Sequence, residues 1–181
     1  VSAQSGNVNT GAFDPLPEIV AAVRELPNAW LHVDGAFGLW AAASPELRHL
    51  AAGIEGADSW TTDAHKWLNV PYDCGIAIVR DGAAHAGAMG HGAAYYVQAE
   101  GTVRDSGNLV AESSRRARGF TVYAALRELG RDGLAELVDR CCALARRMAD
   151  ELRDAPGVTI LNDVVLNQVL VRFVPPDAPD A

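Results

Sequence analysis

The sequence has few cysteines, a minority of basic side chains and no long apolar run. Its three cysteines are Cys74, Cys141 and Cys142, an odd number with two neighbours, so we expect no disulfide framework and a reducing, cytoplasmic location. Fifteen lysines and arginines against 23 aspartates and glutamates give a net charge of -8, which argues against nucleic acid as the main partner. No stretch approaches the ~18 apolar residues of a membrane span, so no membrane partner is expected.

The two ends of the chain also lack the usual markers. No methionine begins the sequence, and VSAQSGNVNT has neither the charged nor the apolar region of a signal peptide. The opening VSAQSG is typical of a strand end that leads into a turn, and the chain closes on the strand NQVLVRF and a tail rich in proline and aspartate. We therefore expect a fragment of a longer polypeptide.

Helical and strand patterns alternate through the first 80 residues. Residues 15–26 predict a helix with Asp14 as N-cap and Pro15 in the first turn, and a second helix is expected to begin at Ser44. The segments AWLHV, ADSWTT and CGIAIVR predict strands, the first ending at Asp34. This alternation indicates an α/β fold with a parallel sheet.

The remaining residues have a different pattern. Residues 82–101 are rich in glycine and alanine and predict a mobile, loop-rich region. From Ser113 onward the spacing is helical, with an apolar stripe from Leu134 to Leu152 that indicates core or subunit interface, and two strands follow. We expect residues 1–125 to be the C-terminal part of a large domain, and residues 126–181 to begin a small α+β domain.

Two residues are candidates for chemistry. Asp34 ends one expected strand and Lys66 follows the next, so both are expected at the carboxyl edge of one sheet, where α/β proteins bind ligands. Alternatively, Asp34 caps a turn and Lys66 is a surface lysine whose stem packs on an aromatic ring. A desolvated amine and a carboxylate across such an edge are what pyridoxal phosphate (PLP) requires, for its aldehyde and its pyridinium nitrogen respectively.

The motif HVDGAFG, followed by DAHKWLNVPYDCG with Lys66 placed 32 residues after Asp34, resembles the group II PLP-dependent decarboxylases. SRRARGFTVYAALRELG extends the similarity. The resemblance implies the fold-type-I PLP-transferase architecture, PLP as cofactor, a small-molecule amino-acid substrate and a homodimer. It makes Lys66 the Schiff-base lysine and Asp34 the partner of the pyridine nitrogen. Ala36 would pack beneath the ring, and His65 would help to position the phosphate.

The sequence departs from the family pattern in three places. The family often has Gly-Thr-Thr where this chain has Gly6-Asn7-Val8, so a threonine hydroxyl is missing, for which Asn7 or Asn9 could substitute. Residues 97–114 lack the loop tyrosine of aromatic-amino-acid decarboxylases, a role left to Tyr95 or Tyr96. The family's phosphate-binding segment and ring-stacking histidine precede the region that this chain matches. The basic run of Arg115, Arg116 and Arg118 lies where the family has an active-site entrance, although a solvated helix start is the simpler interpretation.

These observations lead to one predicted function with alternatives. We expect PLP-dependent decarboxylation of an L-amino acid, with a slight preference for an aromatic or other uncharged side chain. The alternatives are aldehyde-forming oxidative deamination and a catalytically incompetent half domain that only dimerises. No metal site is expected, because His85 and His91 lack zinc-binding spacing and no cysteine is near them.

Overall fold

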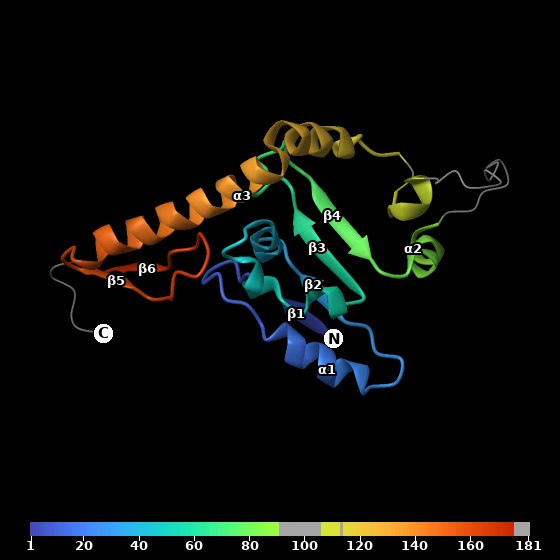
Figure 1. Ribbon diagram of the computed structural model, residues 1–181, viewed down its shortest axis with the longest axis horizontal. Coiled ribbons are helices and arrows are strands. Elements are labelled where there is room, and N and C mark those ends of the chain that lie inside the picture. The colour runs from blue at the N-terminus through green and yellow to red at the C-terminus, as the bar shows by residue number, and fades with distance from the viewer. Residues whose placement is uncertain (91–105, 113, 176–181) are drawn as a thin grey trace.

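The centre of the fold is a four-stranded sheet. The computed structural model describes residues 1–90, 106–112 and 114–175 (Figure 1). The sheet has the order β1-β2-β3-β4, with β1 (Ser2–Gln4), β2 (His32–Asp34), β3 (Ser59–Asp63) and β4 (Gly75–Val79). The first three strands are parallel, which confirms the expected α/β layer, but β4 is antiparallel to β3. Residues 64–74 join β3 to β4 without the crossover helix that a parallel neighbour requires.

Helix α1 (Leu16–Arg24) covers one face of this sheet (Figure 1). Its buried Leu16 and Val23 pack with Leu31 and Val33 in one apolar cluster. The expected N-cap is wrong, because Pro15 takes the cap position with no side-chain hydrogen bond. The Asp14 carboxylate instead accepts a hydrogen bond from the backbone N–H of Gln4 at 2.7 Å, and so it ties the start of the helix to β1.

The helix expected from Ser44 does not form. Residues 38–56 contain three short 3-10 helices, η1 (Gly38–Ala43), η2 (Arg48–Ala51) and η3 (Ile54–Gly56). The Ser44 hydroxyl does accept the capping bonds from the N–H groups of Glu46 and Leu47, both at 3.1 Å. The chain then turns at Gly53, whose φ is 90° and where a Cβ would lie 2.8 Å from Pro17 N. The serine cap is therefore present, but the segment after it contains only the 3-10 helix η2 before the turn at Gly53.

Part of the region expected to be loop is a helix. Helix α2 (Gly82–Met89) begins at Asp81, whose carboxylate accepts hydrogen bonds from the N–H groups of Ala83 and Ala84, both at 2.9 Å. Alanine is the best helix former, so the alanines of this segment outweigh its glycines. A short 3-10 helix, η4 (Ser106–Leu109), follows. His91, Tyr95 and Tyr96 lie outside the described residues.

The C-terminal part consists of one long helix and a strand pair. Helix α3 (Arg118–Arg153) is broken at Gly130, where φ is 62° and ψ is -171°. Strands β5 (Val158–Ile160) and β6 (Val171–Phe173) are antiparallel and lie beside its second half (Figure 1). Part of the apolar stripe is core, since Val138 is fully buried, whereas Leu144 is 57% exposed. The expected domain boundary falls inside α3 and stays a prediction.

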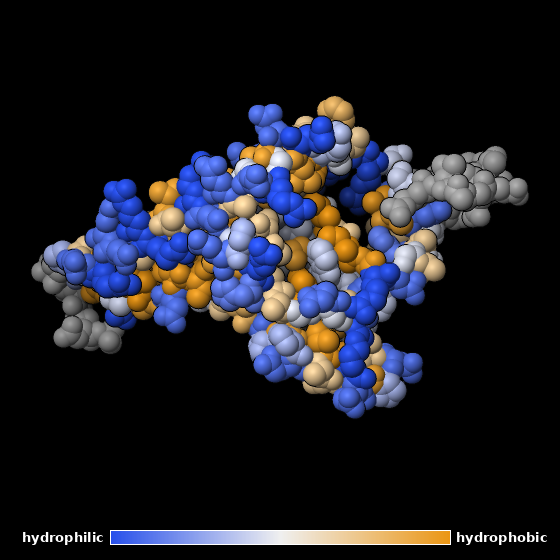
Figure 2. Space-filling view, in the orientation of Figure 1, coloured by the Kyte–Doolittle hydropathy of each residue, from blue (hydrophilic) through white to orange (hydrophobic). Residues whose placement is uncertain are grey.

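Apolar side chains also remain on the surface. Figure 2 shows them over β4 and again along the β5–β6 pair beside α3. The exposed large apolar residues of these elements include Ile78, Leu144, Met148 and Phe173. Among the described residues, no helix is both long enough and apolar enough to cross a membrane.

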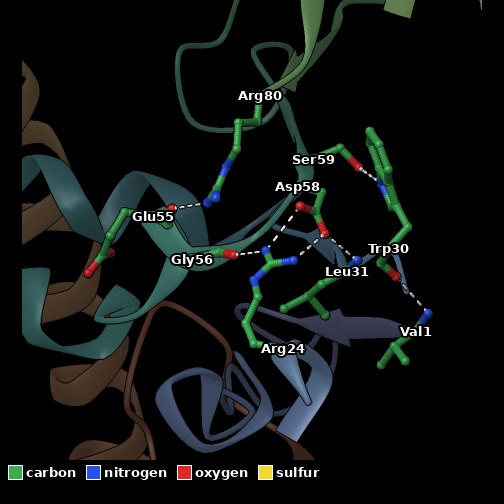
Figure 3. Close-up of polar contacts among 9 residues, drawn as sticks. All are labelled: Val1, Arg24, Trp30, Leu31, Glu55, Gly56, Asp58, Ser59 and Arg80. Atoms are coloured by element: carbon green, nitrogen blue, oxygen red, sulfur yellow. Dashed lines mark hydrogen bonds and ion pairs between the residues drawn. The ribbon is translucent and has the colours of Figure 1, made fainter. Parts of the chain in front are cut away.

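A polar network closes the edge of the sheet at which the parallel strands begin (Figure 3). Asp58, just before β3, accepts hydrogen bonds from Arg24 of α1 and from the backbone N–H of Leu31. Arg80, just after β4, donates to the carbonyl oxygen of Glu55. The α1 helix and three strands are therefore joined at this edge, which leaves the opposite edge for the candidate site.

Candidate active site

The carboxyl ends of β2 and β3 bring the candidate residues to one edge of the sheet. These strands are parallel neighbours, with Asp34 in register with Thr61. Val33 is buried in the cluster beneath α1, and because side chains alternate along a strand, Asp34 faces the other side. Thr61 and Asp63 of β3 face that same side. The predicted meeting of the two strand ends at one edge is thus present in the structure.

Asp34 ends β2 with an exposed carboxylate. Its Oδ1 accepts a hydrogen bond from the N–H of Ala36 at 3.0 Å, and its carbonyl oxygen accepts one from Ser5 N at 2.8 Å. Gly35 N donates to the carbonyl oxygen of Thr61 at 2.9 Å, which fixes the start of the following turn. Among the residues that the structure describes, Oδ2 of Asp34 has no hydrogen-bond partner, so this oxygen is available to a ligand.

Lys66 lies in the turn that follows β3. Its Nζ is 2.9 Å from Oδ2 of Asp63 and 3.9 Å from the centre of the Phe37 ring. The expectation of a desolvated amine is therefore wrong for this structure, because the side chain is 26% exposed and ion-paired. The aromatic contact of the alternative interpretation is present, but it comes from Phe37 in the turn after Asp34. This contact links the two candidate residues through one short turn.

His65 has a mainly structural set of contacts. Its Nδ1 accepts a hydrogen bond from the backbone N–H of Cys74 at 2.9 Å, and its ring packs on Tyr72 with centroids 4.0 Å apart. A neutral ring whose Nδ1 accepts carries its proton on Nε2. That nitrogen lies 3.7 Å from Oδ2 of Asp63. His65 thus closes the loop between β3 and β4 and keeps one N–H on the side of Lys66.

Trp67 anchors the turn that carries Lys66 to the C-terminal part of the chain. Its side chain is 6% exposed and belongs to the same apolar cluster as Val138 and Cys142 of α3. Its indole N–H is buried without a hydrogen-bond partner among the described residues. Lys66 therefore follows a sheet strand and precedes a side chain that is packed against α3.

Two other groups of residues named from the sequence have different roles. The side chain of Asn7 is engaged in its own turn, accepting from Asn9 N at 2.9 Å and donating to Gln4 Oε1 at 2.8 Å. It is therefore not free to replace the absent threonine. Arg118 begins α3 and forms an ion pair with Asp73 in the loop after Lys66. Arg115 instead pairs with Glu112 at 3.0 Å.

Asp63 and Phe37 were not singled out from the sequence, although both contact Lys66. The only local signal was the three-residue spacing between Asp63 and Lys66, which is common in turns. Phe37 lies three residues after Asp34, and its approach to Lys66 depends on how two separate turns fold together.

The donor set fits PLP. A carboxylate with an unpartnered oxygen for the pyridine nitrogen ends β2, and an amine for the aldehyde lies in the turn after β3, and neighbouring strands are ~4.8 Å apart in a sheet. Ala36, half-buried, is a small side chain in the turn that follows Asp34. Within the described part of the chain, no three His, Cys, Asp or Glu side chains are grouped as metal ligands.

Comparisons with known proteins identify the family of this chain. Residues 1–174 match the pyridoxal-dependent decarboxylase conserved domain. The mouse acidic amino acid decarboxylase GADL1 is 34% identical over 97% of this chain and 32% of its own length. The L-2,4-diaminobutyrate decarboxylase of Rhizobium meliloti is 33% identical over 99% of this chain and 36% of its own length.

The fold comparison gives the same result. The crystal structure of mouse CSAD in its apo form superposes with a TM-score of 0.84 at 30% identity, over 97% of this chain and 37% of that one. The chain therefore spans about a third of the length of the relatives that it matches. On these grounds, the chain belongs to the pyridoxal-dependent decarboxylase family.

Proposed function

We propose that this chain is the lysine-bearing part of a PLP-dependent L-amino-acid decarboxylase. The observation that supports the proposal is the convergence of Asp34 and Lys66 at the carboxyl edge of two neighbouring parallel strands. When bound, PLP supplies an electron sink for the electron pair that remains when a carboxylate leaves as CO2.

Each residue of the site has a role in this proposal. Lys66 would hold the aldehyde carbon covalently and give it up to the amino group of the substrate. The free oxygen of Asp34 would hold a proton on the pyridine nitrogen, and its fixed Oδ1 contact with Ala36 N would keep the carboxylate oriented. Ala36 would pack beneath the ring, and the Nε2–H of His65 would donate toward the phosphate.

The sequence and the relatives favour different side chains for the amino-acid substrate. The sequence slightly favours an aromatic or other uncharged side chain. The names of the relatives include acidic amino acids and L-2,4-diaminobutyrate, so the family spans several side-chain types. We therefore propose an L-amino acid and leave the uncharged preference as a prediction for a substrate panel.

Exposed apolar side chains support a homodimer. Leu144 and Met148, one turn apart on α3, are 57% and 52% exposed. Contact with a second copy would remove this surface from water, which would stabilise the dimer by roughly 25 cal/mol for each Å² of apolar surface buried. The half-domain alternative predicts such a dimer without cofactor binding.

The test is to incubate the chain with PLP, reduce with borohydride and map the added mass. We expect the label on Lys66, no label at residue 66 in Lys66→Ala, and weaker labelling of Lys66 at low PLP concentration in Asp34→Asn, because the pyridine nitrogen then loses its anionic partner. An amino-acid panel then distinguishes amine from aldehyde as product, and so decarboxylation from oxidative deamination. Absence of label at millimolar PLP would contradict the proposal for this chain and favour the half-domain alternative.

A further inference from the structure

Asp63 is the most firmly held charged residue near Lys66. It is the last residue of β3 and pairs with Gly75 of β4. Its carbonyl oxygen accepts a hydrogen bond from the indole N–H of Trp40 at 3.3 Å. Its backbone is therefore fixed from two directions, and its carboxylate, 24% exposed, has a defined position at the edge of the sheet.

This carboxylate faces His65 and Lys66, the two basic residues of the turn after β3. Its Oδ2 is 2.9 Å from Nζ of Lys66 and 3.7 Å from Nε2 of His65. On its other side, the Lys66 amine meets the face of the Phe37 ring. An ion pair and a cation–π contact both attract an ammonium group, so these two neighbours hold the Lys66 side chain in this position.

An ammonium group in this position has to change before it can react. To join an aldehyde, Nζ first gives one proton to solvent. The neutral amine then bonds to the carbonyl carbon, and the aldehyde oxygen leaves as water with the two remaining amine hydrogens. The first of these steps abolishes the ion pair with Asp63, because a neutral amine carries no charge for the carboxylate to attract.

We propose that Asp63 is a positioning residue that retains the free Lys66 amine and limits its rate of attack on electrophiles. In a catalytic cycle, Asp63 would capture Lys66 after the substrate amine displaces it, and so delay its return. This use in catalysis rests on the proposed function. The restraint itself concerns only residues of this chain, and it can be tested without cofactor.

The composition of the chain makes the test simple. Lys66 is the only lysine among the 181 residues, so a polypeptide prepared with this sequence has two amino groups, that of Lys66 and the α-amino group of Val1. Val1 donates to the carbonyl oxygen of Trp30 at 2.9 Å, at the opposite edge of the sheet (Figure 3). Trace acetylation with acetic anhydride at fixed pH, followed by peptide mass spectrometry, gives the Lys66-to-Val1 labelling ratio.

We expect Asp63→Asn to raise this ratio about three- to fivefold, at the upper end of the range for loss of one partly exposed ion pair. Asp63→Glu, which keeps a carboxylate, should stay within about twofold of the unaltered chain. The control Asp150→Asn removes the same charge from an exposed pair with Arg153 and should leave the ratio unchanged.

Salt provides a second measurement that needs no variant. In the unaltered chain, 1 M NaCl shortens the screening length to about 3 Å and should raise the ratio, because the Lys66 contact is ionic. An unchanged ratio both in Asp63→Asn and in high salt would overturn the proposal. Since no PLP is present, that outcome is distinct from a failure of the borohydride experiment.

Discussion

We expect Asp58 to stabilise this fold more than an ordinary surface carboxylate does. Its Oδ2 accepts a hydrogen bond from Leu31 N at 2.8 Å, and both oxygens face the guanidinium of Arg24, at 3.0 and 3.2 Å (Figure 3). Leu31 is fully buried, so its N–H has no access to water. Replacing Asp58 by alanine removes the one acceptor that the described residues provide for this N–H.

The magnitude follows from these two contacts. A buried N–H left without an acceptor costs about 1–3 kcal/mol. The pair with Arg24 adds about 0–1 kcal/mol, because the arginine side chain is 38% exposed. We therefore expect Asp58→Ala to lower the free energy of unfolding by about 1–4 kcal/mol. Asp58→Asn retains an amide oxygen for Leu31 N and should cost about 1 kcal/mol.

Urea unfolding followed by tryptophan fluorescence measures these differences. Glu55→Ala is the matched control, because only the backbone carbonyl of Glu55 takes part in the network, where it accepts from Arg80 (Figure 3). This control should lie within about 0.5 kcal/mol of the unaltered chain. If Asp58→Ala is no less stable than Glu55→Ala, the reasoning about Leu31 N is refuted.

The contacts of Asp58 should also make the free energy of unfolding depend on pH. Burial raises the pKa of Asp58, but the hydrogen bonds from Leu31 and Arg24 and the charges of Arg24 and Arg80 outweigh burial and leave the pKa below its usual value. A depressed pKa means that the stabilisation is complete above the unfolded-state value of about 3.9 and is lost as the pH falls through the folded-state value. The difference in unfolding free energy between Asp58→Asn and the unaltered chain should shrink over that range.

The same unfolding assay and thiol chemistry test other parts of the structure. Trp67→Ala should cost about 3–5 kcal/mol, whereas Trp67→Phe should cost less than about 1.5 kcal/mol because the buried indole N–H has no partner to lose. Gly38→Ala should cost about 1–3 kcal/mol, since its Cβ would lie 2.4 Å from a backbone oxygen, whereas Gly82→Ala meets open space and should be neutral or stabilising. Burial raises the pKa of Cys142 to about 11, so iodoacetamide at pH 8 should modify Cys141 and spare Cys142 until urea is added, as judged by mass spectrometry.

The sequence was informative where local patterns decide the structure. Apolar, β-branched runs placed β3 and β4, and parallel strand order brought the ends of β2 and β3 to one edge with Asp34 and Lys66. The direction of β4 was missed because it depends on the length of the connection and not on the strand itself. Helix α2 was missed because its glycines suggested a loop, although the Asp81 cap and the alanines stabilise a helix.

The contacts of Lys66 could not be predicted from its neighbours in sequence. Trp67, Leu68 and Val70 suggested a dry environment, but these side chains pack into the clusters beside α3 and leave the amine at the surface of the turn. Tertiary packing decides whether an apolar side chain near Lys66 shields the amine or packs elsewhere. The partner of the lysine was instead a carboxylate three residues earlier in the sequence.

Two aspartates at opposite ends of β3 illustrate how this fold separates stability from chemistry. Asp58 precedes the strand and satisfies a buried N–H, so its loss should be felt in unfolding. Asp63 ends the strand and faces a partly exposed amine, and its backbone contacts persist in Asp63→Asn, so its loss should be felt in the reactivity of Lys66. Both place a carboxylate at a strand terminus, but the burial of the partner determines what each one does. With the proposed cofactor site at the carboxyl edge, the strands are therefore fixed at the amino edge without constraining the lysine.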